Sequence, residues 1–165
     1  MATALFYASS TGNSEEIANK IASELGDIEV FDLSQTDISK INDYEKVILG
    51  GSTWGEGELN DDWDEAWDSF KTIELSDKTI ALFGLGDQDG YPDDFCNALG
   101  LIYEHVSTSG AQIVGFTSTE GYDYEDSKAE IDGKFVGLVI DEDNQDDLTD
   151  ERIKNWTDDI KSNIL

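Results

Sequence analysis

The sequence predicts an α/β domain in which helices cover both faces of a parallel sheet. Short apolar stretches alternate with amphipathic ones along the 165 residues, as is typical of strands joined by helical crossovers. The first apolar stretch, residues 4–8, lacks charged positions, as expected for a strand buried on both faces. Because the chain is 38% hydrophobic and long enough to enclose one core, we expect a single domain over residues 1–165.

The elements can be placed from apolar periodicity and from the residues that begin or end helices. Pro92 suits a first helical position, and Thr149 can cap a helix whose first turn is acidic. The inward face of that last helix is then formed by Ile153, Trp156, Ile160 and Ile164. The predicted strands are 4–8, 28–33, 46–51, 79–83 and 112–116, and the predicted helices are 12–25, 62–70, 92–110 and a last one from residue 149.

One polar segment interrupts the alternation. Residues 118–134 carry many carboxylates, and an apolar stretch resumes at residues 135–140. An insertion that splits the edge strand explains this pattern better than a sixth independent strand.

Charge and cysteine content exclude several classes of function. Ten basic residues against 38 acidic ones give a net charge of −28, which argues against nucleic acid or an anionic membrane as partner. One cysteine excludes an internal disulfide and a cysteine-ligated cluster. Because the N-terminus does not resemble a signal peptide and no apolar run is long enough to span a membrane, we expect a soluble, cytoplasmic protein.

The loop after the first strand has the composition of a phosphate site. Small hydroxyl-bearing, amide and glycine residues precede the first helix: Ser9, Ser10, Thr11, Gly12, Asn13 and Ser14. Unpaired N–H groups and the positive end of the helix dipole favour an anion there. The loop lacks the lysine of a Walker motif and the three glycines of a dinucleotide fingerprint. An ordinary capped turn remains the alternative.

Two later loops combine an aromatic residue with glycines. Trp54 stands in residues 52–59, and Tyr91 in residues 84–95. The two rings could enclose a flat ligand beside the phosphate loop, whereas either ring alone could simply be partly packed. A phosphate at one end and an aromatic clamp at the other describe a mononucleotide with a large planar base, and FMN fits this description.

These stretches resemble the flavodoxin family over nearly the whole chain. The similar segments are 9–14, 53–59, 82–91 and 135–145, in family order, and residues 118–138 resemble the insertion of the long-chain subgroup. The resemblance implies the flavodoxin-like three-layer sandwich, with a five-stranded parallel sheet in the order 2-1-3-4-5 and an insertion splitting the last strand.

The resemblance also implies roles for the matching positions. Residues 9–14 would hold the FMN phosphate, and Trp54 and Tyr91 would stack on the two faces of the isoalloxazine ring. The Gly55–Glu56 peptide would turn over on reduction. The whole implied cofactor site is Ser9, Ser10, Thr11, Gly12, Asn13, Ser14, Ser52, Thr53, Trp54, Gly55, Glu56, Gly57, Leu85, Gly86, Asp87, Tyr91, Asp94, Phe95, Cys96 and Asp143.

The implied function is that of a low-potential one-electron carrier rather than an enzyme, with non-covalently bound FMN cycling between semiquinone and hydroquinone. An FMN-dependent reductase of a small organic substrate is the alternative. A receiver-type signalling domain is rejected, because Gly50 to Thr53 stand where that domain needs an aspartate. The implied partners are basic redox proteins such as a ferredoxin–NADP reductase or another ferredoxin-dependent oxidoreductase. The resemblance also implies a monomer that binds no metal.

The remaining features favour ordinary structural roles. The sequence has acidic stretches at 56–68, 87–94 and 141–151. They fit either a solvated surface or a surface that docks a partner and lowers the flavin reduction potential. His105 has no catalytic partner in its pattern, so we expect it at the surface or in helix packing. Cys96 is expected to be a small buried residue rather than a redox centre.

Overall fold

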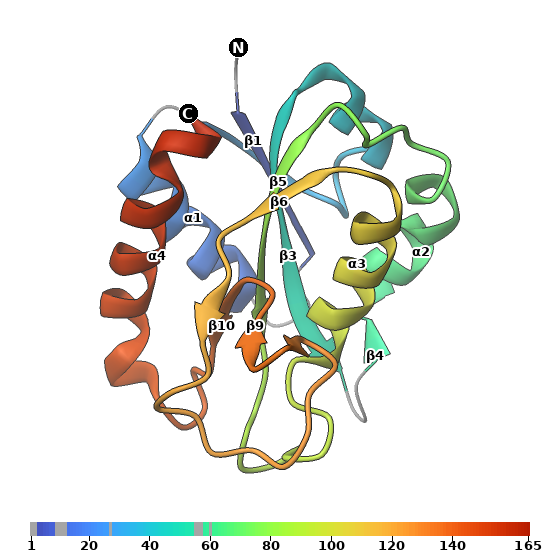
Figure 1. Ribbon diagram of the computed structural model, residues 1–165. Helices are drawn as coiled ribbons and strands as arrows, with labels where there is room; N and C mark the ends of the chain where they lie inside the picture. Colours follow the sequence, from blue (N-terminus) through green and yellow to red (C-terminus); the bar gives the residue numbers. More distant parts are fainter. Residues whose placement is uncertain (1–2, 9–12, 27, 55–57, 60) are drawn as a thin grey trace.

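The computed structural model describes residues 3–8, 13–26, 28–54, 58–59 and 61–165, without the side chains of Trp54, Glu58 and Leu59. A parallel sheet runs through the middle of the molecule (Figure 1). Its strands are β1 (Thr3–Ala8), β2 (Ile28–Asp32), β3 (Lys46–Trp54), β5 (Thr79–Leu85), β6 (Gln112–Val114) and β10 (Leu138–Ile140), while β4 (Glu58–Leu59) pairs antiparallel with the end of β3.

The strand order confirms the predicted 2-1-3-4-5 arrangement. The order runs β2-β1-β3-β5, and β6 and β10 share the fifth position, each parallel to β5. Helices α1 (Asn13–Leu25) and α4 (Thr149–Ile164) cover one face of the sheet. Helices α2 (Asp61–Phe70) and α3 (Asn97–Thr108) and the 3-10 helix η1 (Ile38–Asp43) cover the other (Figure 1).

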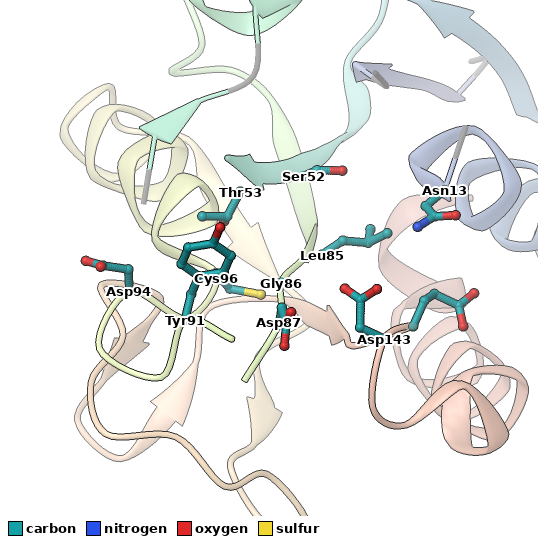
Figure 2. A pocket seen from close by; sticks show the side chains of 11 residues that line it. Asn13, Ser52, Thr53, Leu85, Gly86, Asp87, Tyr91, Asp94, Cys96 and Asp143 are labelled. Carbon is teal, nitrogen blue, oxygen red and sulfur yellow. The ribbon is translucent and has the colours of Figure 1, made fainter. Parts of the chain in front are cut away.

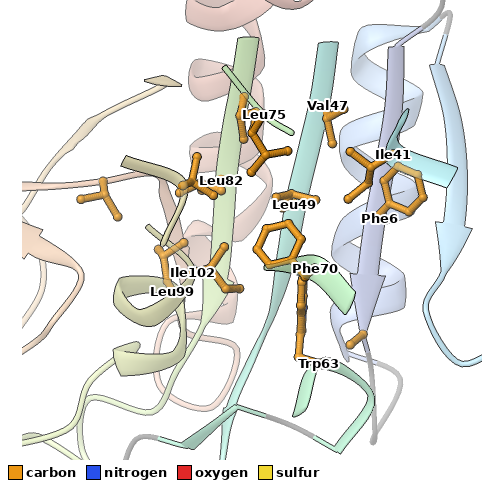
Figure 3. Close-up of a cluster of buried hydrophobic side chains, with 14 of the residues drawn as sticks. Phe6, Ile41, Val47, Leu49, Trp63, Phe70, Leu75, Leu82, Leu99 and Ile102 are labelled. Carbon is orange, nitrogen blue, oxygen red and sulfur yellow. The ribbon is translucent and has the colours of Figure 1, made fainter. Parts of the chain in front are cut away.

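Each face of the sheet buries its own apolar layer, because successive side chains of a strand point to opposite sides. Along β1, Phe6 joins Leu49, Phe70 and Leu99 beneath α2 and α3 (Figure 3). Leu5 faces the opposite way, and its layer includes the predicted inward residues of the last helix: Ile153, Trp156, Ile160 and Ile164. None of the helices that the structure describes is long and apolar enough to cross a membrane.

The last strand is split, as the polar segment predicts. β6 pairs with residues 79–81 of β5, and β10 pairs with residues 83–85. Between them lies a small antiparallel sheet of β7 (Thr117–Ser118), β9 (Lys134–Phe135) and β8 (Glu130–Ile131), in the order β7-β9-β8. Phe135 therefore belongs to the insertion, and the main-sheet strand begins only at Leu138 rather than at the predicted residue 135.

The prediction that a helix begins at Pro92 is wrong. α3 begins at Asn97, and Cys96 before it has a left-handed backbone with φ 52°. The backbone before Cys96 pairs with the insertion instead of continuing a helix. Glu125 and Asp126 donate backbone N–H groups to the Pro92 carbonyl at 2.8 and 2.9 Å, and Phe95 donates to the Asp126 carbonyl at 3.2 Å.

The prediction that Thr149 caps the last helix is also wrong. A 3-10 helix, η2 (Asp146–Leu148), runs directly into α4, so Leu148 occupies the cap position with a helical backbone. Thr149 is the first helical residue and its hydroxyl donates to the Glu142 carboxylate at 3.0 Å. Because a leucine side chain has no hydrogen-bond acceptor, no side-chain cap forms at Leu148.

Candidate functional site

A cavity of about 310 Å³ opens at the carboxyl ends of the central strands (Figure 2). Parallel pairing places these ends together, since Ala8 of β1 lies beside Gly51 of β3, and Ser52 lies beside Leu85 of β5. Ligands of such sheets bind at this edge. The lining residues are Asn13, Ser52, Thr53, Leu85, Gly86, Asp87, Tyr91, Asp94, Cys96, Glu142 and Asp143.

Most of the predicted site residues that the structure describes come together in this cavity. Ten of its eleven lining residues belong to the predicted set, and Glu142 is the one that the sequence analysis missed. Glu142 stands in an acidic stretch, and a run of consecutive carboxylates does not tell which side chain faces the cavity. The described part of the chain does not include residues 9–12 and 55–57 or the side chain of Trp54. The phosphate loop and the stacking of Trp54 on the ring therefore stay predictions.

One end of the cavity is built on the first turn of α1. Asn13 is exposed and lines the cavity, whereas Ser14 is fully buried. The Ser14 hydroxyl lies 2.7 Å from the Ser52 hydroxyl at the end of β3. The first turn of a helix presents unpaired N–H groups and a positive dipole, so this end is suited to an anion.

The opposite end is aromatic and more open. Tyr91 is 45% exposed, which leaves its ring free to contact a ligand, and Figure 2 shows it with Asp94 and Cys96 on the far side of the cavity from Asn13. Between the ends, Gly86 lets the end of β5 lie close to Cys96, since a Cβ at residue 86 would be only 2.7 Å from the Cys96 Sγ. Thr53 supports this end by accepting a hydrogen bond from the Ala98 N–H at 3.1 Å.

Two predicted site residues do not present a side chain to the cavity. Phe95 is fully buried in an aromatic cluster with Tyr122, Tyr124 and Phe135 of the insertion. Ser14 reaches the cavity only through its contact with Ser52. Phe95 therefore joins the site to the insertion.

Asp141 holds the loops at the aromatic end and was not predicted as a site residue. Its carboxylate is fully buried and accepts backbone N–H groups from Gln88, Asp143 and Asn144 at 3.0 to 3.1 Å. Gln88 is 5% exposed, and its side-chain oxygen accepts the Asp123 N–H at 2.5 Å. The insertion is thereby linked to the loop after β5.

Two carboxylates on the cavity wall have opposite pKa shifts. Burial alone would raise the pKa of Asp87, but hydrogen bonds from the Gly90 N–H, the Asn144 amide and the Asp89 N–H outweigh it and lower the pKa. Asp143 is exposed, and the pKa of its carboxyl is raised by partial desolvation, followed by repulsion from Asp87 and Asp141. The charge of Asp87 is therefore stabilised by its hydrogen bonds, whereas the charge of Asp143 is opposed by its neighbours.

Carboxylate oxygens of Asp87, Asp141 and Asp143 lie within 4.8 Å of one another. Such a cluster has the chemistry of an oxygen-ligated divalent cation site. The Asp141 oxygens, however, already accept the backbone N–H groups described above. The close approach of the three carboxylates is therefore explained by the role of Asp141 in holding the loops.

Cys96 and His105 lie where the sequence analysis expects them. Cys96 is buried, and burial followed by repulsion from Asp141 raises the pKa of its thiol well above the usual value, which disfavours the reactive thiolate. His105 packs between α3 and α2, with ring centroids 5.9 Å from Trp67 and 5.1 Å from Phe70.

The residues present fit a mononucleotide with a flat base. The cavity joins a helix N-terminus with hydroxyls at one end to an exposed tyrosine at the other, with a close backbone approach at Gly86 between them. Its volume lies at the lower end of the range for small-molecule sites. An anion at α1 and a ring at Tyr91 are the two groups that this arrangement can recognise.

Comparison with known proteins identifies the family of this chain. The Flavodoxin family model matches residues 5–156. The chain is 46% identical over 160 residues to a flavodoxin of Nostoc sp., covering 96% of this chain and 94% of the relative, and 45% identical over 160 residues to that of Helicobacter pylori, covering 97% and 96%. The crystal structure of Fusobacterium nucleatum flavodoxin bound to flavin mononucleotide covers 99% of both chains, with TM-score 0.94 and 33% identity. The chain therefore belongs to the flavodoxin family.

Proposed function

We propose that this protein is a low-potential one-electron carrier that binds FMN non-covalently in the cavity at the carboxyl ends of β1, β3 and β5. The observation that carries the proposal is the cavity that joins the first turn of α1 to the exposed ring of Tyr91. Membership of the flavodoxin family and the FMN-bound Fusobacterium nucleatum relative support it. The bound FMN would supply the one-electron chemistry, and we propose that the carrier would use its semiquinone and hydroquinone states.

The chain's residues have distinct roles in this proposal. Asn13 and the N–H groups of the first α1 turn hold the phosphate. Tyr91 stacks against the ring and shields one of its faces from water. Leu85 and Gly86 form the wall between the two ends, and the missing side chain of Gly86 leaves room for Cys96 beside it.

The carboxylates of the cavity wall favour a low reduction potential. Asp87, Glu142 and Asp143 line the cavity, and each opposes an added electron. At ~8 Å and an effective dielectric of ~40, one such charge disfavours the reduced anion by about 1 kcal/mol. For one electron this corresponds to roughly 45 mV.

The visible spectrum of the purified protein tests the proposal directly. We expect a yellow protein that releases FMN on denaturation and gives a one-electron intermediate during stepwise reduction. A colourless protein that takes up no FMN, or one that releases FAD, contradicts the proposal. Mixing with NADPH alone should leave the protein oxidised, whereas reduction by NADPH would favour a reductase of small organic substrates.

We propose that the partner is a basic redox protein of the ferredoxin–NADP reductase type. α2 follows directly from the segment attached to the end of β3, and it carries Asp61, Asp62 and Asp64 in its first turn. Glu65 and Asp68 of the same helix are exposed. Opposite charges accelerate encounter, and salt weakens this effect.

Two fourfold variants test whether α2 is the docking surface. One neutralises Asp62, Asp64, Glu65 and Asp68 as amides, and the matched control neutralises Glu120, Asp123, Glu125 and Asp132 of the insertion. The α2 variant should slow electron transfer at low ionic strength, with little effect at high salt. Equal slowing of both variants would show that net charge alone steers the encounter, and no slowing of either would contradict a charged docking surface.

A further inference from the structure

The chain has two Asp–Gly pairs, and the structure treats them differently. Asp89–Gly90 lies in the loop after β5 and Asp132–Gly133 lies in the insertion, and all four residues are exposed. In an Asp–Gly pair the backbone nitrogen of the glycine can attack the side-chain carboxyl of the aspartate, because glycine has no side chain that hinders the approach. By sequence and exposure alone, the two pairs should react alike.

The backbone around Asp89–Gly90 is held by one carboxylate. The N–H groups of Gly90 and Asp89 donate to Asp87 Oδ1 at 2.8 and 3.1 Å, and the Tyr91 N–H donates to the Asp87 carbonyl at 2.9 Å. A Cβ at residue 90 would lie only 2.6 Å from Asp87 Oδ2. The Gly90 nitrogen is therefore engaged, and its peptide has little room to turn toward the Asp89 side chain.

Asp132 and Gly133 form the turn between β8 and β9. Ile131 pairs with Lys134, so these two residues alone connect the strands, and their φ values are both positive, 53° and 82°. A two-residue turn of this kind favours an Asp–Gly pair. Within the described part of the chain the Gly133 N–H has no hydrogen-bond partner, and a Cβ on Gly133 would meet nothing within 4 Å. The nitrogen that follows Asp132 is therefore free, and its peptide has room to move.

We propose that Asp132 is a site of spontaneous backbone isomerisation in the folded protein, and that Asp87 protects Asp89 from the same reaction. The Gly133 nitrogen attacks the protonated side-chain carboxyl of Asp132. The new C–N bond closes a succinimide ring, and the proton of the nitrogen leaves with the carboxyl hydroxyl as water. Water then adds to either carbonyl of the ring and breaks its bond to the nitrogen, which gives aspartate or isoaspartate. No reactant besides water takes part.

The modification falls on the insertion and spares the cofactor cavity. Isoaspartate adds one carbon to the backbone of the turn between β8 and β9, at the surface of the molecule. Gly90 instead precedes Tyr91, which lines the cavity. The hydrogen bonds of Asp87 therefore preserve the backbone beside the aromatic end of the site.

Water enriched in ¹⁸O reports the reaction, because each hydrolysis of the ring leaves one solvent oxygen in the product. The purified full-length protein is incubated in the folded state at mildly acidic pH, digested in ordinary water and analysed by mass spectrometry. Asp132 should take up label at least about tenfold faster than Asp89, the rate ratio that corresponds to one hydrogen bond to a charged group. Part of the labelled Asp132 peptide should be isoaspartate, identified by fragmentation.

Two variants and the unfolded chain complete the design. Asp87→Ala removes the acceptor of the Gly90 N–H, so labelling of Asp89 should rise about tenfold while that of Asp132 stays unchanged. Asp132→Glu keeps the charge but must close a larger ring, so the label at this position should be lost. In urea the parent should label both pairs at similar rates, because the unfolded chain keeps neither arrangement.

The outcomes separate the effect of the fold from that of the local sequence. Equal labelling of Asp132 and Asp89 in the folded parent would overturn the proposal, as would a rate ratio that persists in urea or a labelled Asp132 peptide without isoaspartate. Unchanged labelling of Asp89 in a folded Asp87→Ala variant would overturn the protecting role of Asp87. The comparison of folded and unfolded parent does not depend on that variant, nor on whether the protein binds FMN.

Discussion

The two ends of the cavity are built in different ways. At α1, the described anchoring contact is a single hydroxyl pair, between Ser14 and Ser52. At the other end, the loop after β5 is tied to two distant parts of the chain. Asp141 joins it to the turn after β10, and Gln88 and Phe95 join it to the insertion. One end depends on a helix terminus, and the other on long-range hydrogen bonds.

This difference shows that an irregular loop needs contacts with distant residues to hold binding groups in place, whereas a helix terminus does not. A helix N-terminus presents its N–H groups by its own geometry. The segment from Gly86 to Cys96 has no regular structure, and its backbone is fixed by pairing with residues far along the chain, such as Asp126 with Phe95 and Asp141 with Gln88. Substitutions at the aromatic end should therefore affect the stability of the apoprotein more than those at the α1 end.

The largest effect should come from Asp141→Ala. Three backbone N–H groups, those of Gln88, Asp143 and Asn144, lose their acceptor in a buried place. We expect the free energy of unfolding of the apoprotein to fall by about 3 kcal/mol, at roughly 1 kcal/mol for each unpaired donor. Urea unfolding followed by far-ultraviolet circular dichroism measures the change.

Asn13→Ala is the matched control at the other end. Asn13 lines the cavity but is exposed, so its removal should change the free energy of unfolding by less than about 0.5 kcal/mol. The comparison of the two ends is mistaken if both variants lose the same stability.

The strand order and the split edge strand could be predicted from the sequence because both depend on patterns along the chain. Apolar stretches alternate with helices, the polar residues 118–134 interrupt the last strand, and the family resemblance supplies the order 2-1-3-4-5. Hydroxyls and glycines after the strands also located most of the cavity, because strand ends meet at one edge of a parallel sheet.

What the sequence could not predict depends on contacts between distant residues. Pro92 is a good helix start by local preference, but the carbonyl of this residue accepts two N–H groups from the insertion and the helix begins only at Asn97. Asp141 stands in a run of acidic residues, and only its complete burial distinguishes it from its neighbours. Local composition does not contain this information.

Gln88→Ala should have an intermediate effect, because it removes one contact between the insertion and the loop after β5. The Asp123 N–H loses its acceptor, while the backbone bond from Gln88 to Asp141 remains. We expect a loss of about 1 kcal/mol in the free energy of unfolding. Hydrogen exchange at Asp123 should accelerate as well, and unchanged exchange there would show that the insertion does not depend on this bond.

The smallest effect, and one of opposite sign, should come from Asp143→Asn. Partial desolvation of the exposed Asp143 and the neighbouring carboxylates Asp87 and Asp141 raise the pKa of Asp143 above its ordinary value of 3.8. Between that value and the raised pKa the folded protein binds more protons than the unfolded chain, so ionisation of Asp143 costs stability as the pH rises through this window. The amide removes that cost, and the apoprotein should be slightly more stable than the parent at pH 7.

The gain in stability should shrink as the pH falls toward 3.8. Asp159→Asn on α4 is the control for the loss of one negative charge. Urea unfolding of both variants at several pH values measures the difference, and a gain that stays constant with pH would show that the carboxylates of the cavity wall do not repel one another.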